Sequence, residues 1–326
     1  MGYAQTPSHK SRYLLKWAAT IAAVIVVALP CGAQSKAAAQ QQPDTFFSQE
    51  LNKYPGLLPE FGKLLGKLQQ NVQFPPERSE TRLLPLLPAS TISYTAIPNY
   101  GNAARQAVTI FRQELQESSV LRDWWEHGEM AKSGPKFLDS LEKLAQLHEY
   151  FGDEIVVSAS LQGQKPNLLL IAEVRKPGLK KFLQESIVQL GTESKPGLRI
   201  LDLNELATAE DKGPSQDSVV LIRPGFVIAG PNVAGVRSFN AGLDHGGLGF
   251  ASTPFGQRTL KEYESGVTLL ASADLQKILK QTDPNTKPDS NLQRSGFADV
   301  KYLVWDHKRV EGQSISQTEV SFNGPR

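Results

Sequence analysis

The chain is poor in cysteine, with Cys31 as the only one among its 326 residues. An intramolecular disulfide needs two cysteines, so no such crosslink stabilises the fold, and a metal site built from several thiolates is excluded as well. Residues 40–326 offer no thiol nucleophile. A domain of this length therefore depends on the burial of apolar side chains for its stability.

The chain also lacks an excess of basic residues once its N-terminus is set aside. Four of the 35 Lys and Arg residues, and none of the 33 Asp and Glu residues, lie in residues 1–39. Residues 40–326 therefore carry 31 basic and 33 acidic residues, a formal net charge of −2. Nucleic-acid binding relies on clustered Lys and Arg that displace counterions. We therefore exclude nucleic acid as the main partner.

No linear catalytic or cofactor-binding motif is present. Four histidines follow the N-terminal segment (His127, His148, His245 and His307), and no two of them have the spacing of a helical metal site. No serine has the nucleophile-elbow pattern of a hydrolase. We therefore predict no metal and no cofactor. Because active sites assembled from distant segments leave no linear motif, this absence does not exclude an enzyme.

The N-terminus has the three parts of a secretory signal. A basic stretch, residues 9–16, precedes the apolar run Trp17–Leu29, and small residues follow as far as Ala39. We favour a signal peptide that is cleaved after Ala33 or after Ala39. This segment predicts that the rest of the chain lies in the periplasm or at the outer face of the inner membrane.

Two other interpretations of the N-terminus stay open. An uncleaved anchor is the first, although the apolar run has 13 residues and a spanning helix needs about 20, with about 17 as the lower limit. Lipid attachment at Cys31 is the second, although Pro30 stands where a small residue is required. In each case the chain leaves the cytoplasm, and only its N-terminal segment contacts the membrane.

Residues 40–88 are predicted to hold a tether, a helix and a linker. The chain is rich in Ala and Gln up to Asp44, which is typical of a low-complexity tether. Leucines at spacings of three and four predict an amphipathic helix from Gly56 to about Val72. Two prolines then end the helix, and an extended linker leads to Pro88.

The remaining sequence predicts an α+β fold in which largely antiparallel sheets are covered by helices. Residues 167–174 (NLLLIAEV) are nearly all apolar, which is typical of a strand covered on both faces. The helix starting at Gly134-Pro135 is expected to bury one apolar face. That face comprises Phe137, Leu141, Leu144, His148 and Phe151. The predicted strands are residues 91–98, 154–161, 167–174, 198–203, 218–223, 226–229, 266–271, 298–307 and 314–322.

The order of these elements divides the body into residues 89–250 and residues 251–326. From Gly266 the chain repeats the order strand, helix, strand, strand that begins at Thr91, although no residue-level identity supports the match. This order suggests a duplicated unit whose second copy is partial. A terminal two-stranded ribbon is marginally stable without cover, so we expect exposed side chains at Leu303 and Trp305 or at their opposite-face neighbours.

Five residues are candidates for ligand binding. Adjacent side chains on a helix diverge by about 100°, so we expect one of Trp124 and Trp125 to be buried and the other to be exposed. An exposed tryptophan beside His127 would suit ligand recognition. Asp244 and His245, in the Gly-rich stretch at 242–249, form the second candidate group.

Several segments carry a resemblance to a known group of sequences. They are LLPASTISYTAIPN, LQESSVLRDWW, YFGDEIVVSASL, VVLIRPGFVIAG and GVTLLASADLQKIL. Together they resemble an uncharacterised family of exported bacterial proteins, defined only as a domain of unknown function. The resemblance covers roughly Leu83 to Phe322 and implies export and an α+β fold. It implies no catalytic residue.

We therefore predict an exported, periplasmic or envelope-associated module that binds a partner or has a structural role, without enzymatic activity. The expected partner is an envelope protein or a small ligand. The alternative is a secreted hydrolase that uses carboxylates and histidines brought together by folding, with His127 and His245 as the first candidates. A cleft that holds several of these groups would favour the hydrolase.

Overall fold

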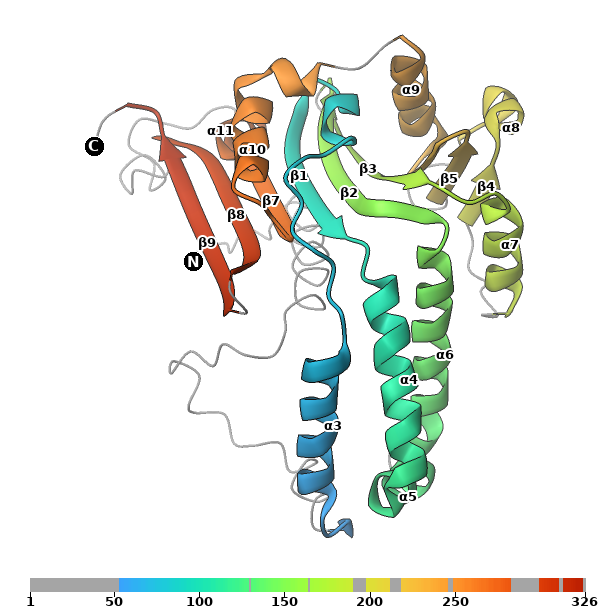
Figure 1. Ribbon diagram of the computed structural model, residues 1–326. Helices are drawn as coiled ribbons and strands as arrows, with labels where there is room; N and C mark the ends of the chain where they lie inside the picture. Colours follow the sequence, from blue (N-terminus) through green and yellow to red (C-terminus); the bar gives the residue numbers. More distant parts are fainter. Residues whose placement is uncertain are drawn as a thin grey trace, which may run out of the picture. The chain divides into compact units, whose positions relative to one another are not determined.

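The computed structural model describes residues 53–128, 130–163, 165–189, 198–211, 218–245, 249–282, 299–310 and 313–324. The predicted signal segment at 1–39 and the tether up to Asp44 lie outside these residues. Residues from Tyr54 onward form one compact unit. Helices and strands are both abundant, and the strands form one sheet (Figure 1), so the predicted α+β class is confirmed.

The sheet has nine strands in the order β4-β5-β6-β3-β2-β1-β7-β8-β9. Every neighbouring pair is antiparallel except β4 and β5, which are parallel. The strands are β1 (Thr91–Pro98), β2 (Phe151–Gln162), β3 (Lys165–Val174), β4 (Leu198–Leu201), β5 (Ser218–Arg223), β6 (Phe226–Gly230), β7 (Leu269–Asp274), β8 (Val300–Val310) and β9 (Gln313–Phe322). β1 pairs with both β2 and β7, so residues 89–250 and 251–326 contribute to the same sheet.

Eleven helical elements accompany the sheet in the described part of the chain. They are α3 (Leu57–Asn71), η1 (Leu84–Leu86), α4 (Gly101–Glu117), α5 (Ser119–His127), α6 (Met130–His148), α7 (Leu179–Gln189), α8 (Leu203–Thr208), α9 (Val233–Asp244), η3 (Phe250–Ser252), α10 (Pro254–Glu264) and α11 (Leu275–Thr282). The structure confirms the predicted helix near residues 56–72. Helix α6 begins at Met130, about one turn before the predicted start at Gly134.

Several helices begin where a side chain can accept a hydrogen bond from a free backbone N–H. Ser118 accepts from Leu121 N at the start of α5, and Thr253 accepts from Gly256 N at the start of α10. Asp202 and Glu205 form a reciprocal capping box at α8. These caps satisfy backbone groups that the first turn of a helix leaves unpaired.

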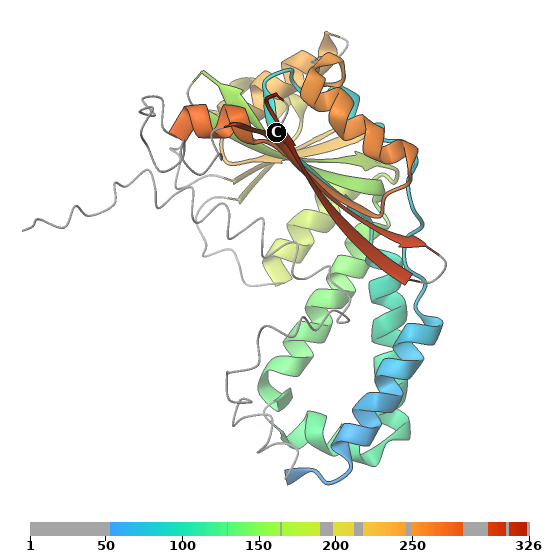
Figure 2. The same cartoon turned by 90° about the vertical axis from the view of Figure 1, so that its left-hand side faces the viewer.

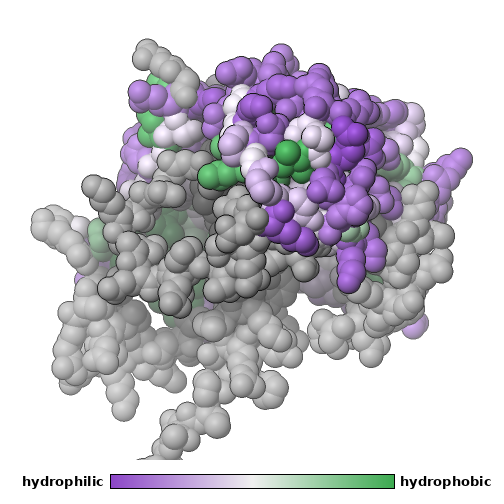
Figure 3. Space-filling model, turned by 90° about the horizontal axis from the view of Figure 1, so that it is seen from below, coloured by the Kyte–Doolittle hydropathy of each residue, from purple (hydrophilic) through white to green (hydrophobic). Residues whose placement is uncertain are grey.

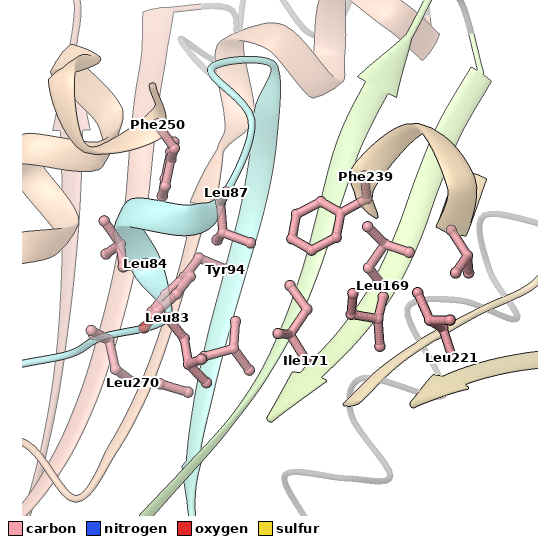
Figure 4. Close-up of a cluster of buried hydrophobic side chains, with 14 of the residues drawn as sticks. Leu83, Leu84, Leu87, Tyr94, Leu169, Ile171, Leu221, Phe239, Phe250 and Leu270 are labelled. Atoms are coloured by element: carbon pink, nitrogen blue, oxygen red, sulfur yellow. The ribbon is translucent and has the colours of Figure 1, made fainter. Parts of the chain in front are cut away.

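The main core lies on one face of the sheet (Figure 4). Side chains from β1, β2, β3, β5, β6 and β7 meet side chains from η1, η3, α9 and α10 there. Leu84, Leu87, Phe239 and Phe250 come from the covering segments and are almost fully buried. Aromatic contacts extend this core toward β8, because Phe255 stacks on Tyr302 with ring centroids 5.3 Å apart.

Helices α3, α4, α5 and α6 form a bundle that we call the helical arm (Figures 1 and 2). α3 packs on α4 and α5, and α6 packs on α4 and α5. Lys67 of α3 forms ion pairs with Glu114 and Glu117 of α4. Within the described residues, we find no helix with both the length and the hydrophobicity needed to cross a membrane.

The C-terminal hairpin is unevenly covered. Tyr302 and Val304 of β8 are buried, and Leu303 and Trp305 on the opposite face are half-buried. β9, which is an edge strand, is exposed from Gln313 to Val320. The expected exposure of Leu303 and Trp305 or of their opposite-face neighbours is therefore wrong, and the exposed strand of the hairpin is β9.

Candidate functional site

The two adjacent tryptophans lie inside the helical arm. Trp124 contacts Phe61 of α3 edge to face, with centroids 5.0 Å apart, and Trp125 contacts Phe111 of α4 at 4.9 Å. Both tryptophans are half-buried. The expectation that one is buried and the other exposed is wrong, because α3 packs on one side of α5 while α4 and α6 pack on the other. Both indoles serve the packing of the arm.

The three remaining predicted site residues are at the surface. His127 pairs with Asp123 one turn earlier on α5, at 2.9 Å, and both side chains are more than 60% exposed. Asp244 forms an ion pair with Arg223 at 2.9 Å, and the adjacent His245 is exposed. Because α5 and α9 lie at opposite ends of the unit (Figure 1), these groups share no cleft, and the geometry does not support the hydrolase alternative built on them.

A buried polar cluster joins the segment before β1 to the sheet. Glu154 Oε1 accepts hydrogen bonds from the hydroxyl groups of Tyr94 and Tyr263, both at 2.8 Å, and from Thr81 at 3.1 Å. Burial raises the pKa of both phenols, so they remain protonated donors. Arg78 lies 3.8 Å from the same carboxylate, and its side chain is only 9% exposed.

The backbone of Arg78 reinforces this junction. It exchanges two hydrogen bonds with Val267, of 2.8 and 3.0 Å, which fastens the segment beside β7. The guanidinium nitrogens of Arg78 have no hydrogen-bond acceptor among the described residues. Because these contacts tie the segment before β1 to β2, β7 and α10, we assign the cluster a role in stability.

The two faces of the sheet are covered to different extents, as the exposure of side chains at adjacent positions shows. On one face, residues aligned across the eight strands from β4 to β8 are all buried, because η1, α9 and α10 cover them. This row is Leu201, Leu221, Ile228, Ile171, Val156, Ala96, Leu270 and Asp306.

On the other face, which we call the open face, the matching row contains no buried residue. It crosses all nine strands through Ile200, Val220, Ala229, Leu170, Val157, Thr95, Ala271, Trp305 and Thr318. Leu170 is 36% exposed. An antiparallel sheet that faces water normally carries polar residues on that side, whereas most of this row is apolar.

The central strands of the open face carry small side chains between larger ones, and we call this set of ten residues the trough. Its walls are Leu168 and Leu170 on β3 and Leu303 and Trp305 on β8. Between the walls, the floor has shorter side chains from β2, β1 and β7. The floor residues are Val157, Ala159, Ser93, Thr95, Ala271 and Ala273. None of these ten side chains is ionisable, and the imidazole of His307 stacks on Trp305 beside them, with ring centroids 6.3 Å apart.

Helix α6 extends the apolar surface beyond the sheet. Leu147 packs with Ala172 and Leu179 in a small core on the open-face side. Residues three or four positions apart share a helix face, so the stripe through Leu147 continues along α6 to Leu144, Leu141 and Phe137. Phe137 is 56% exposed and Leu144 is 53% exposed, so the prediction that this face is buried is wrong for these two side chains.

A shallow depression of about 400 Å³ lies beside this small core, between residues 174–180 and 222–225. Four basic side chains line it, and each already has an acidic partner. The pairs are Arg175–Asp153, Lys176–Glu149, Lys180 with Asp202 and Glu205, and Arg223–Asp244. These ion pairs neutralise the basic lining, so the depression has no free cation for an anionic ligand.

Apolar side chains are also exposed on α3, where Leu58 is 62% and Leu65 is 53% exposed. Seen from below, the described surface is mostly hydrophilic, with small hydrophobic patches (Figure 3). No group of three His, Cys, Asp or Glu side chains in the described residues is placed to hold a metal ion. We take the trough and the α6 stripe as the candidate binding surface, because the open-face row continues across all nine strands.

Sequence reasoning missed this surface although one signal was present. The apolar run at residues 167–174 predicted a strand that is covered on both faces. The structure covers Leu169 and Ile171 but leaves Leu168 half-buried and Leu170 exposed.

Comparison with known proteins adds no further information. No family model, curated protein or solved structure matches the chain. The resemblance to an uncharacterised exported family stays a prediction. The function has to be argued from the surface itself.

Proposed function

We propose that the chain is an exported binding module that holds an apolar partner in the trough of the open face. The observation that carries this proposal is the nine-strand row from Ile200 to Thr318, in which no residue is buried and most are apolar. Export is supported by the N-terminal signal pattern.

The hydrophobic effect favours covering this surface. Each square ångström of apolar surface removed from water contributes about 25 cal/mol. Soluble monomers rarely leave contiguous apolar patches larger than a few hundred Å² exposed. A surface made of Leu168, Leu170, Leu303 and Trp305 therefore gains stability when a partner covers it.

The same surface is poorly suited to catalysis. Its ten residues include no carboxylate, amine, imidazole or thiol, and the imidazole of His307 beside Trp305 is buried and hydrogen-bonded to Ser316. The hydroxyl groups of Ser93 and Thr95 lie among apolar neighbours. The trough therefore suits binding without chemical change.

The binding proposal can be tested with an environment-sensitive apolar dye and the chain from Gln40 onward. We expect saturable dye binding that Leu170→Gln weakens about tenfold, equivalent to about 1.4 kcal/mol. Leu65→Gln is the matched control, because Leu65 is 53% exposed on α3, away from the trough. Absence of dye binding, or equal weakening by both substitutions, would overturn the proposal.

Export is tested separately by the N-terminus of the chain recovered from the cell envelope. We expect it to begin at Gln34 or Gln40, in agreement with cleavage after Ala33 or Ala39. The chain should also remain soluble without a reductant, because either cleavage removes Cys31. Recovery in the cytoplasm with Met1 intact would contradict export.

A further inference from the structure

The two edge strands of the sheet differ in length and composition. β4 has four residues and includes Arg199, whereas β9 has ten residues and is therefore about 33 Å long. Proteins usually protect an edge strand by short length, lysine, proline or a bulge. β9 contains no lysine, arginine or proline, and its register with β8 is unbroken from Gln313 to Ser321. In the described structure β9 pairs with β8 alone, so its outer edge can accept another strand.

Two backbone hydrogen bonds show which peptide groups of β9 point outward. The carbonyl of His307 on β8 accepts from Thr268 N on the β7 side, so the peptide groups of its β9 partner Ser316 point away from β8. Asn323 N, just after β9, donates to Asp299 O on the β8 side. Because neighbouring residues of an antiparallel strand alternate in direction, both bonds give the same set of outward residues. They are Ser314, Ser316, Thr318 and Val320.

The side chains of β9 suit a strand that pairs with itself. Glu319 is the only ionisable residue of the strand, and its carboxylate forms an ion pair with Arg258 of α10 at 2.8 Å. Most of the others are serine, threonine and glutamine, and serine and threonine hydrogen-bond well across neighbouring strands. Ile315 is 39% exposed and Val320 is 40% exposed, so a second strand would also cover apolar surface.

We propose that β9 pairs with β9 of a second copy of this chain, antiparallel and about a two-fold axis at Gln317. This register places Ser314 opposite the partner's Val320 and Ser316 opposite the partner's Thr318, so all four outward residues form hydrogen-bonded pairs. Each of the four pairs exchanges two bonds, which gives about eight, close to the roughly ten of a typical protein–protein interface. The contact uses the edge of the sheet and is independent of the trough.

The same register keeps like charges apart. Glu319 lies opposite the partner's Ile315, so the two Glu319 carboxylates are separated by four residues along the strands, about 14 Å. Salt screens exposed charges over about 8–10 Å, which leaves little repulsion between them. A two-fold axis uses the same edge of both copies, so the assembly closes as a dimer.

Disulfide crosslinking tests the register. The chain from Gln40 onward contains the whole compact unit and no cysteine, so an introduced thiol is unique. At the axis Gln317 faces its own copy in a non-hydrogen-bonded pair, with Cα atoms about 4.5 Å apart, which a disulfide can bridge. We expect Gln317→Cys to form disulfide-linked dimers under mild oxidation. Ile315→Cys is the matched control, because its two copies lie about 14 Å apart. Equal linking by both substitutions, or by neither, would overturn the proposal.

Analytical ultracentrifugation of the same chain tests whether the backbone edge holds the dimer. Thr318→Pro removes an outward N–H, and proline is tolerated on an edge strand whose N–H faces solvent. We expect this substitution to weaken dimerisation about tenfold, equivalent to about 1.4 kcal/mol. Thr318→Val keeps the N–H and the branched shape, so it should leave the dimer intact.

A third variant separates this contact from the open face. Leu170→Gln changes the trough and leaves β9 unaltered, so we expect it to dimerise like the parent chain even where it weakens dye binding. A monomeric parent chain, a dimer that survives Thr318→Pro, or a dimer lost only with Leu170→Gln would overturn the proposal. If Thr318→Pro does not fold, the disulfide comparison of Gln317 with Ile315 decides the outcome.

Discussion

At the scale of single residues, Glu154 has the largest structural role that the sequence did not reveal. Its carboxylate receives three hydroxyl groups and faces the buried Arg78, so it connects β1, β2, α10 and the segment before β1. In the sequence, Glu154 follows Asp153 and is one of two adjacent carboxylates at the start of a strand. Only the fold buries one of them and leaves the other at the surface.

Replacement of Glu154 tests this role. Glu154→Ala leaves the charge of Arg78 buried and unpaired, so we expect the free energy of unfolding to fall by about 3–5 kcal/mol. Tyr263→Phe removes one hydrogen bond and should cost about 1 kcal/mol. Urea denaturation of the chain from Gln40 measures both. A loss below that of Tyr263→Phe would show that Glu154 does not hold Arg78.

Burial of His307 makes the free energy of unfolding depend on pH. Burial lowers its pKa below the usual value, so the folded chain holds the imidazole neutral where the unfolded chain protonates it. This contribution is present above the unfolded pKa of about 6.5 and is lost as the pH falls through the lower folded value. We therefore expect stability to decline from pH 7.5 to pH 5, and His307→Gln to reduce the decline.

Two other groups enter the same measurement. Burial also lowers the pKa of His148, which acts in the same direction and keeps part of the decline in the His307 variant. Burial raises the pKa of Asp306, whose contribution is instead lost as the pH rises through its raised value. The measurement is therefore the urea midpoint of unfolding from pH 7.5 to pH 5, compared between the His307→Gln variant and the parent chain. An unchanged slope would contradict the prediction.

At the scale of elements, the periodicity of apolar residues predicted where most helices and strands lie. It did not predict which elements pack against one another. The predicted strands at 91–98 and 226–229 match β1 and β6 closely. The short helix α8 was missed, although Asp202 and Glu205 have the spacing of a capping box. For α6 the pattern identified an apolar face correctly and assigned it to the core wrongly. A helix pattern shows that a face is apolar, whereas only packing shows what covers it.

Glycines in the arm provide a prediction at this scale. A methyl group added at Gly101 of α4 would lie 1.8 Å from Cβ of His148 on α6. We expect Gly101→Ala to destabilise the fold by about 1–3 kcal/mol because the two helices must separate. Gly62→Ala on α3 is the control, since nothing lies within 4 Å of the added atom.

The control should change stability in the opposite direction. Alanine is favoured over glycine in a helix interior by up to about 1 kcal/mol. We expect thermal unfolding to show a higher midpoint for Gly62→Ala and a lower midpoint for Gly101→Ala. If both substitutions raised the midpoint, the close approach of α4 and α6 would be wrong.

At the scale of the whole unit, the sheet has one covered face and one open face. This asymmetry follows from topology, because η1, α9 and α10 all pack on one side, while α7 and the end of α6 cover one corner of the other and α11 contacts β8 and β1. Two adjacent residues of β3, one on each face of the sheet, differ in their exposed fraction. Leu169 is 1% exposed, and Leu170, on the opposite face, is 36% exposed.

Truncation of these two leucines tests the asymmetry. Leu169→Ala opens a cavity in the main core, and we expect a loss of about 2–5 kcal/mol in the free energy of unfolding. Leu170→Ala removes a side chain that is partly in water and should cost about 1 kcal/mol or less. Chemical denaturation of both variants gives the comparison. Similar losses would show that the open face is as well covered as the core.

The sequence by itself determined the signal pattern, the absence of a disulfide, the near-neutral charge of the body and the alternation of strands with helices. These properties are local: composition and periodicity over ten to twenty residues are enough to state them. They also indicated an α+β fold with mostly antiparallel strands, because short turns between strands favour antiparallel neighbours.

Tertiary structure alone decided which apolar faces are covered. The strand run at 167–174 and the stripe from Phe137 to Leu147 look like core segments in the sequence, and each is partly exposed in the fold. Burial depends on contacts between residues far apart in the chain, such as η1 and α9 against β3, and no local pattern encodes which element comes to lie there. The candidate site lies where side chains with an apolar, core-like sequence pattern are left without a covering element.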